Sequence, residues 1–290
     1  MDRDKNIVLC PNPYRDLGLQ GTLEAKKMLE SAGFHVLISL IYGSQEGIEI
    51  PQEAELTPIK EAIENAGLVV TFGGDGSILH TSRAVIEKTA PIIGINLGYK
   101  GFLTALEKNQ IGELLAVAEG EYVPSPRMMI DVQLIRNGKV IYSDNALNDA
   151  VVTGIARSIQ LTVMGDGQKI TAYSGDGVIL ATPTGSTAYS MSAGGPIVEP
   201  TAENIILTPI CAHMFTSRSF VLAPERVVLV KVGELNERRA VLSVDGGDYV
   251  NLESGDEIQI KKSDYKTLLV LTGKKSFYDI VYEKLEERNR

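Results

Sequence analysis

The residues of this chain best suited to chemistry lie in the stretch TFGGDGSILH, residues 71–80. Glycines at 73, 74 and 76 leave almost no side chain around one carboxylate, Asp75. An ordinary turn needs one or two glycines, so we expect another molecule to approach the backbone here. The stretch follows an apolar run and precedes a helix-like run, where backbone N–H groups and the helix dipole favour an anion.

A carboxylate in a loop that favours an anion is unusual. It repels phosphate unless Mg²⁺ or a hydroxyl hydrogen lies between them. Asp75 is therefore predicted to be a partner of a metal ion, a base for an attacking hydroxyl, or both. The spacing of the glycines matches neither GxGxxG nor the P-loop. A plain turn is the alternative interpretation.

A second cluster of polar residues is SGDGVILATPTGSTAYSMSAGGP, residues 174–196. Its six Ser and Thr hydroxyls between 182 and 192 predict a polar pocket for a ribose or an amide, with a Ser/Thr-rich surface loop as the alternative. There is no GxSxG elbow for a hydrolase. The stretch NALNDAVV, residues 145–152, contributes Asn148 and Asp149, a pair that alone indicates only a turn.

Strands and helices must position these residues, and the two alternate over the first 120 or so residues. Apolar strands are expected at 6–10, 34–42, 68–72 and 90–96, and helices at 21–33, 59–67, 77–88 and 110–120. Such alternation predicts an α/β domain with a parallel sheet covered on both faces. Ligands of these sheets bind beyond the carboxyl ends of the strands, where Asp75 and the loop 96–104 would lie.

The pattern changes after residue 122 to short β-rich runs with hairpin signals at RNGK and GDGQ. We expect an all-β, sandwich-like domain, followed by a C-terminal helix that returns to the first domain. The predicted domains are therefore 1–122, 123–272 and 273–290.

Composition narrows the classes of function. The 290 residues carry a net charge of −9, which disfavours binding of nucleic acid, and no apolar run is long enough to span a membrane. The N-terminus has no signal-peptide core, so we expect a cytoplasmic protein. Cys10 and Cys211 are expected to be reduced and buried, and the three histidines lack the spacing of a protein-built metal site.

Taken together, FGGDGSIL, GINLGYKGFLT, LNDAVV, DGVILATPTGSTAYSMSAGGP and LTPICAH resemble the NAD kinase family, in matching order. The resemblance implies transfer of the γ-phosphoryl group of ATP to the 2′-hydroxyl of the adenosine ribose of NAD, giving NADP. It also implies dependence on Mg²⁺ or another divalent cation. The family further implies a homodimer or homotetramer whose NAD site draws on a neighbouring subunit.

The same resemblance assigns roles to individual residues. Asp75 would be the general base for the acceptor hydroxyl, with Gly74 and Gly76 beside it, and Asn148 with Asp149 would hold the adenosine of NAD. The remaining candidates for the dinucleotide pocket are Phe102 near the adenine, Asp176, Thr187, Ala188, Tyr189, Ser190, Ser192 and Cys211.

Position 174 departs from the family pattern. Many members carry a basic residue where this chain has Ser174. Arg157 is a candidate for a replacement cation, with an ordinary surface arginine as the alternative. The choice between NAD and NADH therefore stays open, and the sequence does not indicate whether polyphosphate can replace ATP. The alternatives to an NAD kinase are a lipid or sugar kinase with a similar GGDG loop, or a non-catalytic NAD-binding regulator.

Overall fold

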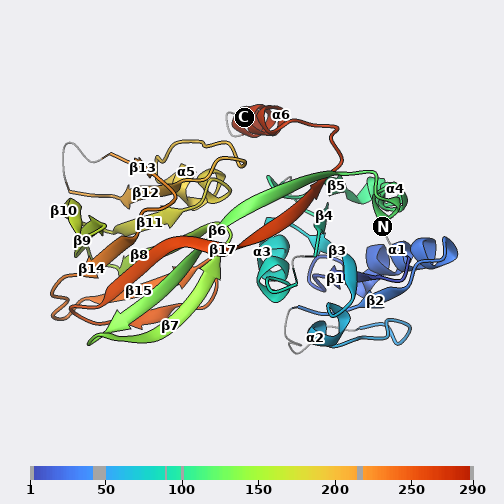
Figure 1. The fold of residues 1–290 in the computed structure, drawn as a ribbon, viewed down its shortest axis with the longest axis horizontal. Helices are drawn as coiled ribbons and strands as arrows, with labels where there is room; N and C mark the ends of the chain where they lie inside the picture. The colour runs from blue at the N-terminus through green and yellow to red at the C-terminus, as the bar shows by residue number, and fades with distance from the viewer. Residues whose placement is uncertain (1–2, 42–49, 89, 99–100, 214–217, 288–290) are drawn as a thin grey trace. The chain divides into compact units, whose positions relative to one another are not determined.

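The computed structural model describes residues 3–41, 50–88, 90–98, 101–213 and 218–287 (Figure 1). The chain forms two compact units, one of residues 1–126 and 267–290 and the other of residues 127–266. The chain leaves the first unit within strand β6 (Val123–Arg136) and returns to it within β17 (Glu257–Leu271). The domain boundaries expected from the sequence stay predictions.

The first unit contains a parallel sheet in the order β2-β1-β3-β4. Its strands are β1 (Asn6–Pro11), β2 (Val36–Ile38), β3 (Ala66–Gly73) and β4 (Ile92–Asn96), and β5 (Leu106–Glu107) pairs in parallel with β4. The final part of β17 also pairs with β4, with Leu269 opposite Ile92. Residues 68–73 are all buried, as expected for a strand covered on both faces.

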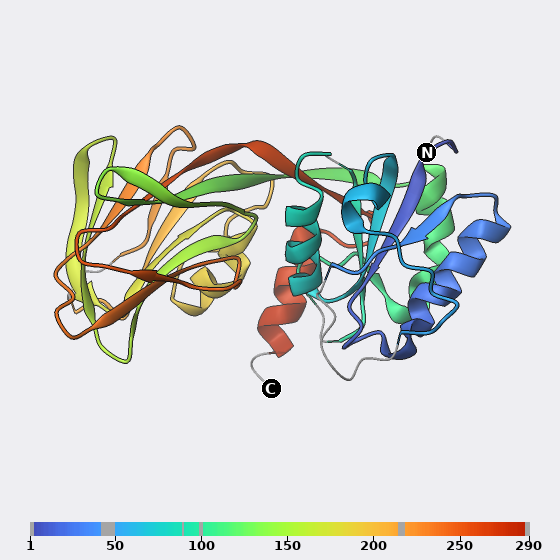
Figure 2. The same ribbon diagram turned by 90° about the horizontal axis from the view of Figure 1, so that it is seen from below.

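Helices cover both faces of this sheet. Figure 2 shows α1 and α4 on one side of the strands and α3 on the other. The bounds are η1 (Leu17–Leu19), α1 (Gln20–Ser31), α2 (Ile59–Ala62), α3 (Asp75–Ala84), η2 (Lys108–Glu113), α4 (Leu114–Glu119) and α6 (Phe277–Glu287). The predicted α/β domain with a parallel sheet is confirmed.

Two helices differ from their predicted bounds by more than one or two residues at an end. The helix expected over 59–67 ends at Ala62, because β3 begins pairing with β1 at Ala66 and the sheet overrides local helix propensity. Helix α3 begins at Asp75, two residues before the expected start at Ser77, since the Gly74 carbonyl already accepts the Ser77 N–H at 2.9 Å. The glycine at 76 therefore lies in the first turn of α3.

The second unit is a two-sheet sandwich. One sheet has the order β10-β9-β14-β17-β6-β7 and the other β13-β12-β11-β8-β15-β16. The remaining bounds are β7 (Lys139–Ala146), β8 (Asp149–Ile155), β9 (Ile159–Gly165), β10 (Gln168–Gly175), β11 (Gly177–Ala181), η3 (Gly185–Thr187), α5 (Tyr189–Ser192), β12 (Ile205–Ile210), β13 (Phe220–Leu222), β14 (Val228–Val232), β15 (Arg239–Val244) and β16 (Val250–Leu252).

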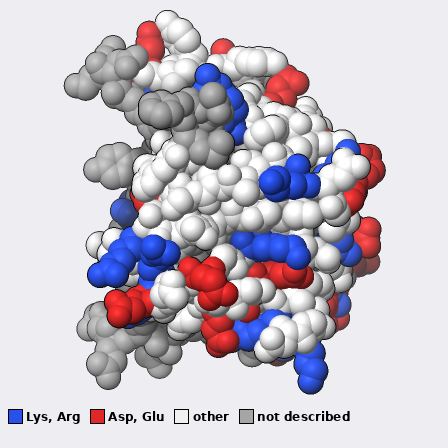
Figure 3. Space-filling view, turned by 90° about the vertical axis from the view of Figure 1, so that its left-hand side faces the viewer, with Lys and Arg blue, Asp and Glu red and all other residues white. Residues whose placement is uncertain are grey.

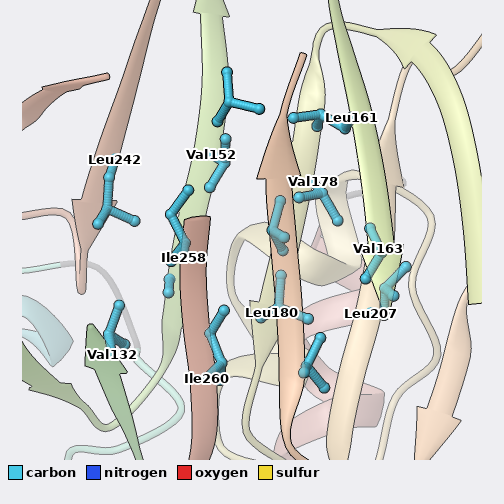
Figure 4. Close-up of a cluster of buried hydrophobic side chains, with 14 of the residues drawn as sticks. Val132, Val152, Leu161, Val163, Val178, Leu180, Leu207, Leu242, Ile258 and Ile260 are labelled. Atoms are coloured by element: carbon cyan, nitrogen blue, oxygen red, sulfur yellow. The ribbon is translucent and has the colours of Figure 1, made fainter. Parts of the chain in front are cut away.

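The core of this unit combines side chains of both sheets. Figure 4 shows Val132 and Ile258 of one sheet in the same cluster as Val152, Leu180 and Leu242 of the other. Inward residues alternate with outward ones along β9, β14 and β15, the pattern of a sandwich. The predicted β-rich domain is confirmed.

Both predicted hairpins form where the sequence places them. Asn137 and Gly138 have φ of 50° and 74° between β6 and β7, and Asp166 and Gly167 have φ of 47° and 78° between β9 and β10. Two consecutive left-handed residues are the requirement of a tight hairpin turn, which Asn-Gly and Asp-Gly meet.

The C-terminal helix α6 is present and belongs to the first unit. Lys274, just before α6, forms an ion pair with Glu113 at 2.7 Å. Among the described residues, no helix is both long and apolar enough to cross a membrane. Figure 3 shows one face of the molecule, on which the basic and acidic side chains of the described residues are interspersed.

Candidate functional site

The GGDG loop lies at the carboxyl ends of β1, β3 and β4. The Asn12 N–H, just after β1, donates to the Phe72 carbonyl at 2.8 Å, and the Leu97 N–H, just after β4, donates to the Gly73 carbonyl at 2.8 Å. Three strand ends therefore meet around the glycines, as expected for a ligand site of a parallel sheet.

The three positions of the loop are occupied by glycine for different reasons. A Cβ on Gly73 would stand 2.1 Å from Ser77 Oγ, so packing within the chain requires this glycine. A Cβ on Gly74 or Gly76 would have no described atom within 4 Å. Neither has the left-handed φ that favours glycine, and Gly74 is extended at φ −133°. Nothing among the described residues thus requires either glycine, and the space beside them suits a ligand.

Asp75 docks a second segment against this loop. Its carboxylate accepts the N–H groups of Phe102 at 2.7 Å and Leu103 at 3.0 Å. A Cβ on Gly101 would stand 1.9 Å from Asp75 Oδ1, so only glycine fits there. A carboxylate has about four lone-pair sites, so each oxygen keeps capacity for a further donor or a cation. Phe102, predicted near the adenine, is half-buried and lines a cavity of about 260 Å³ within this unit.

A dedicated metal cage is absent from the described part of the chain, where no three His, Cys, Asp or Glu side chains are grouped for a metal ion. Mg²⁺ commonly binds through one or two carboxylates together with substrate phosphates. The half-buried carboxylate of Asp75, beside the open space at Gly76, fits a cation that arrives with a phosphate.

In the second unit, one carboxylate holds the Asn148–Asp149 loop at the start of β8. Asp245 Oδ2 accepts the Leu147 N–H at 2.8 Å, and its Oδ1 accepts the N–H groups of Asn148 at 2.7 Å and Asp149 at 3.0 Å. The Asp245 N–H donates in return to the Asp149 carbonyl at 2.9 Å. The backbone of the loop is therefore fixed from outside.

This loop and the turn that contains Thr184 present polar atoms that lack partners among the described residues. Across the described residues, the buried Asn148 Oδ1 and Thr184 Oγ1 have no hydrogen-bond partner. An unpaired buried polar atom costs free energy unless a ligand or water completes it. Asp149 is only 5% exposed, and burial, reinforced by the Asp245 charge, raises the pKa of its carboxyl to about 7.

The hydroxyls of residues 182–192 mostly serve the scaffold. Thr182 Oγ1 donates to the Leu147 carbonyl at 2.5 Å, Thr187 Oγ1 to the Thr184 carbonyl at 3.2 Å, and the Ser190 hydroxyl bonds Thr208 at 2.8 Å. All of these hydroxyl-bearing side chains are buried. The interpretation of the whole stretch as a pocket lining is therefore too broad, because several of its hydroxyls join the turn to neighbouring strands.

A second group of candidates lines another hollow of this unit. Arg157, Asp176 and Tyr189 line a cavity of about 460 Å³. The other candidates lie nearby in the sequence: Ala188 half-buried and Ser192 exposed at α5, and Ser174 half-buried at the end of β10. Cys211, expected to be buried, is exposed instead, because the chain leaves β12 at Ile210 in a left-handed turn with φ 44° at residue 211.

The two groups lie at opposite ends of the same pair of strands. β8 and β11 are antiparallel, with Asp149 opposite Ala181 and Thr153 opposite Gly177. Four residues of extended strand separate the two ends by roughly 13 Å, at about 3.3 Å per residue. A ligand of one chain that touched both Asn148 and Asp176 would have to be as extended as a dinucleotide.

Sequence reasoning does not find Asp245 as a functional residue. The sequence identifies it only as part of an Asp-Gly turn, and the turn itself is present, because φ is 50° at Asp245 and 66° at Gly246. No local signal connects residue 245 with a loop 96 residues earlier. The pairing of β8 with β15 creates that contact.

Comparisons with known proteins find relatives over most of the chain. Residues 12–122 match the model of the ATP-NAD kinase N-terminal domain, and residues 129–272 match that of the ATP-NAD kinase C-terminal domain. An NAD kinase of Ruminiclostridium cellulolyticum is 34% identical over 287 residues, covering 98% of this chain and 99% of the relative. An NAD kinase of Carboxydothermus hydrogenoformans is 41% identical over 239 residues, covering 81% and 85%.

Two solved structures are also similar. Yeast NADH kinase complexed with NADH superposes with a TM-score of 0.85 at 26% identity, covering 97% of this chain and 87% of that chain. An NAD kinase from Archaeoglobus fulgidus in complex with ATP superposes with a TM-score of 0.72 at 27% identity, covering 97% and 98%.

Proposed function

Since this chain belongs to the NAD kinase family, we propose that it transfers the γ-phosphoryl group of ATP to the 2′-hydroxyl of the adenosine ribose of NAD, giving NADP. The observation that carries the proposal is the open space at Gly74 and Gly76 beside the docked carboxylate of Asp75. Neither glycine is required by the residues that the structure describes, so the space suits two substrates that meet at one carboxylate.

In this proposal Asp75 orients the acceptor hydroxyl and takes its proton. A carboxylate is a weak base toward an alcohol, but phosphoryl transfer has a loose transition state, so the proton leaves late and positioning matters more than basicity. The amides of Phe102 and Leu103 hold both carboxylate oxygens and so supply that positioning. Mg²⁺ or another divalent cation would enter with ATP and neutralise charge on the phosphates.

The dinucleotide is proposed to bind the second unit. The unpaired Asn148 Oδ1 and the buried Asp149 support an adenosine site at the start of β8. The cavity of Arg157, Asp176 and Tyr189 supports a second contact region. Because the two regions lie at opposite ends of β8 and β11, we propose a homodimer or homotetramer in which they serve sites shared between subunits.

The alternative kinases and the non-catalytic regulator are not favoured. Both matched family models are those of ATP-NAD kinases, and together they span residues 12–122 and 129–272. A regulator could dispense with Asp75, whereas here that residue retains its glycines and its docking contacts.

The test is production of NADP from NAD, ATP and Mg²⁺, detected with an NADP-specific dehydrogenase. Asp75→Asn keeps the shape of the side chain but loses its charge, so we expect turnover to fall by about a thousandfold or more, the size of effect seen when a catalytic group is removed. Binding of NAD should remain close to the wild-type level. Near-normal turnover in this variant would contradict the role of Asp75 as base.

The same assay tests the open questions of donor and acceptor. Polyphosphate in place of ATP, and NADH in place of NAD, are compared at equal concentration. The absence of NADP from the wild type, with NAD still bound, would favour the regulator. Phosphorylation of a lipid or a sugar phosphate instead of NAD would favour a different kinase with a GGDG loop.

A further inference from the structure

Asp245 is a turn residue whose carboxylate binds a loop far from it in the sequence. Its two carboxylate oxygens gather three consecutive backbone N–H groups, those of residues 147–149, at 2.7–3.0 Å. Hydrogen bonds to an ionised acceptor are shorter and stronger than neutral ones. These bonds lie outside the ladder of β8, which begins only at Asp149.

The position of Asp245 in the fold explains how it reaches the loop. Strand β15 pairs with β8 as far as Val244 opposite Ala150. The chain then turns through two left-handed residues, Asp245 and Gly246, which projects the carboxylate over the preceding end of β8. Aspartate tolerates a left-handed backbone better than most residues.

The backbone of the loop is also held from the opposite side. The Asn148 carbonyl accepts the Thr182 N–H at 2.8 Å, and a Cβ on Gly185 would stand only 2.1 Å from that carbonyl oxygen. Both the N–H and the carbonyl of Asn148 are thus used within the chain. Its side-chain Oδ1 is left, within the described residues, as a buried acceptor that has no partner.

The arrangement brings two carboxyl groups together at a buried place. The charge of Asp245 acts against ionisation of Asp149, which is almost fully buried. A left-handed Asp-Gly pair does not by itself require this repulsion, since Asp166 and Gly167 form such a pair at an exposed position. The repulsion between the two carboxyl groups is understandable if the function requires the loop to be held in one geometry.

We propose that Asp245 is a positioning residue for dinucleotide binding: by fixing the backbone of residues 147–149, it aims the side chains of Asn148 and Asp149 at the adenosine of NAD. The inference rests on the proposed function, because it takes this loop as the adenosine site. It adds a residue that makes no contact with the substrate and acts through Asn148 and Asp149.

The test replaces Asp245 by Asn in the full chain. Asn keeps the left-handed turn but offers one acceptor oxygen, and its NH₂ group faces a backbone N–H, so the loop loses at least one bond. We expect the Kd for NAD, measured by calorimetry, to rise about tenfold or more, which corresponds to the loss of one good hydrogen bond. The KM for ATP should stay within about twofold, since the phosphate cradle lies on other elements.

Asp166→Asn is the matched control. Asp166 also precedes a left-handed glycine and also accepts a backbone N–H, that of Val227 at 3.0 Å, but it is exposed and lies in another turn. We expect no change in the Kd for NAD. An equal rise in both variants would overturn the proposal, because the effect would then be general to such turns.

Two further measurements keep the proposal falsifiable. Amide hydrogen exchange of residues 147–149 should accelerate in Asp245→Asn whatever the ligand is, and faster exchange with unchanged NAD affinity would overturn the inference while leaving the proposed function intact. The absence of NAD binding by the wild type would instead contradict the proposed function. If Asp245→Asn does not fold, Asp245→Ser, which retains one acceptor, is expected to show the same selective rise in Kd.

A double variant tests the route of the effect. If Asp245 acts through Asn148, its substitution should change the Kd for NAD much less in an Asn148→Ala background than in the wild type. Strict additivity of the two changes would contradict the positioning role.

Discussion

The GGDG loop and the Asn148–Asp149 loop prepare their carboxylates by opposite means. Around Asp75 the chain removes side chains, and residues 74 and 76 border open space. Around Asp149 the chain adds contacts, and a second carboxylate from Asp245 fixes the backbone of a buried loop. The first loop suits a step in which two substrates must approach each other, and the second suits selective binding of one of them.

Two kinds of glycine occur in the first loop, and replacing them gives the largest effect expected from this comparison of the two loops. Gly76→Val places a side chain in the open space, so the fold should be retained while turnover falls about a hundredfold or more through exclusion of substrate from its productive position. Gly73→Ala should instead lower the free energy of unfolding, because its Cβ would collide with Ser77 Oγ. Thermal unfolding and the NADP assay measure the two outcomes.

Gly112→Val is the control for this pair. A Cβ on Gly112 would also have no described atom within 4 Å, but this glycine lies in η2, away from the loop. We expect neither stability nor turnover to change much. Full activity in Gly76→Val would remove the strongest support for a ligand at the GGDG loop.

The second expected effect concerns the buried carboxyl pair. Because the pKa of Asp149 is raised to about 7, the folded chain binds more protons than the unfolded chain between about pH 4 and 7. The free energy of unfolding contributed by this group therefore falls as the pH rises through that window. Asp149→Asn removes the effect, so stability relative to wild type should increase by about 2–3 kcal/mol between pH 5 and 8.

Urea unfolding of both proteins at pH 5 and pH 8 measures this difference, since titrating groups away from the Asp149–Asp245 pair contribute about equally to wild type and variant. A difference that does not change with pH would mean that Asp149 titrates in its ordinary range. Asp245→Asn, which removes the neighbouring charge, should lower the pKa of Asp149 and reduce the pH dependence in part.

The same contrast between the two loops decides how much of each can be predicted from the sequence. The GGDG loop is visible because its evidence is local: three glycines, one carboxylate, and a strand before a helix. The parallel sheet can also be predicted, since its strands are continuous apolar runs such as residues 68–72. The hairpins at Asn137-Gly138 and Asp166-Gly167 can be predicted from their turn residues.

What the sequence does not reveal depends on pairing between distant strands. The contact of Asp245 with residues 147–149 exists only because β15 lies beside β8. The hydroxyls of residues 182–192 look like a pocket lining until Ser190 is seen to bond Thr208 of β12 and Thr182 to bond Leu147. Polar residue types indicate that a hydrogen bond is made, and the tertiary structure decides whether its partner is the chain or a ligand.

The smallest expected effect concerns two asparagines close together in the sequence. Replacing each of them tests whether the hydrogen-bond partner of its side chain is the chain or a ligand. Asn148→Ala removes an acceptor with no partner among the described residues, so we expect the KM for NAD to rise about tenfold with little change in the KM for ATP, in line with the loss of one ligand hydrogen bond.

Asn145→Ala removes a side chain that already bonds Asp131 at 2.7 Å, so it should lower stability by about 1 kcal/mol and leave both KM values near wild type. Steady-state kinetics with each substrate varied in turn, together with thermal unfolding, measures both variants. Equal changes in the two KM values for Asn148→Ala would place that residue outside the adenosine site. The proposed difference between the two loops would then fail for the Asn148–Asp149 loop, because that loop would no longer be the one held for a single substrate.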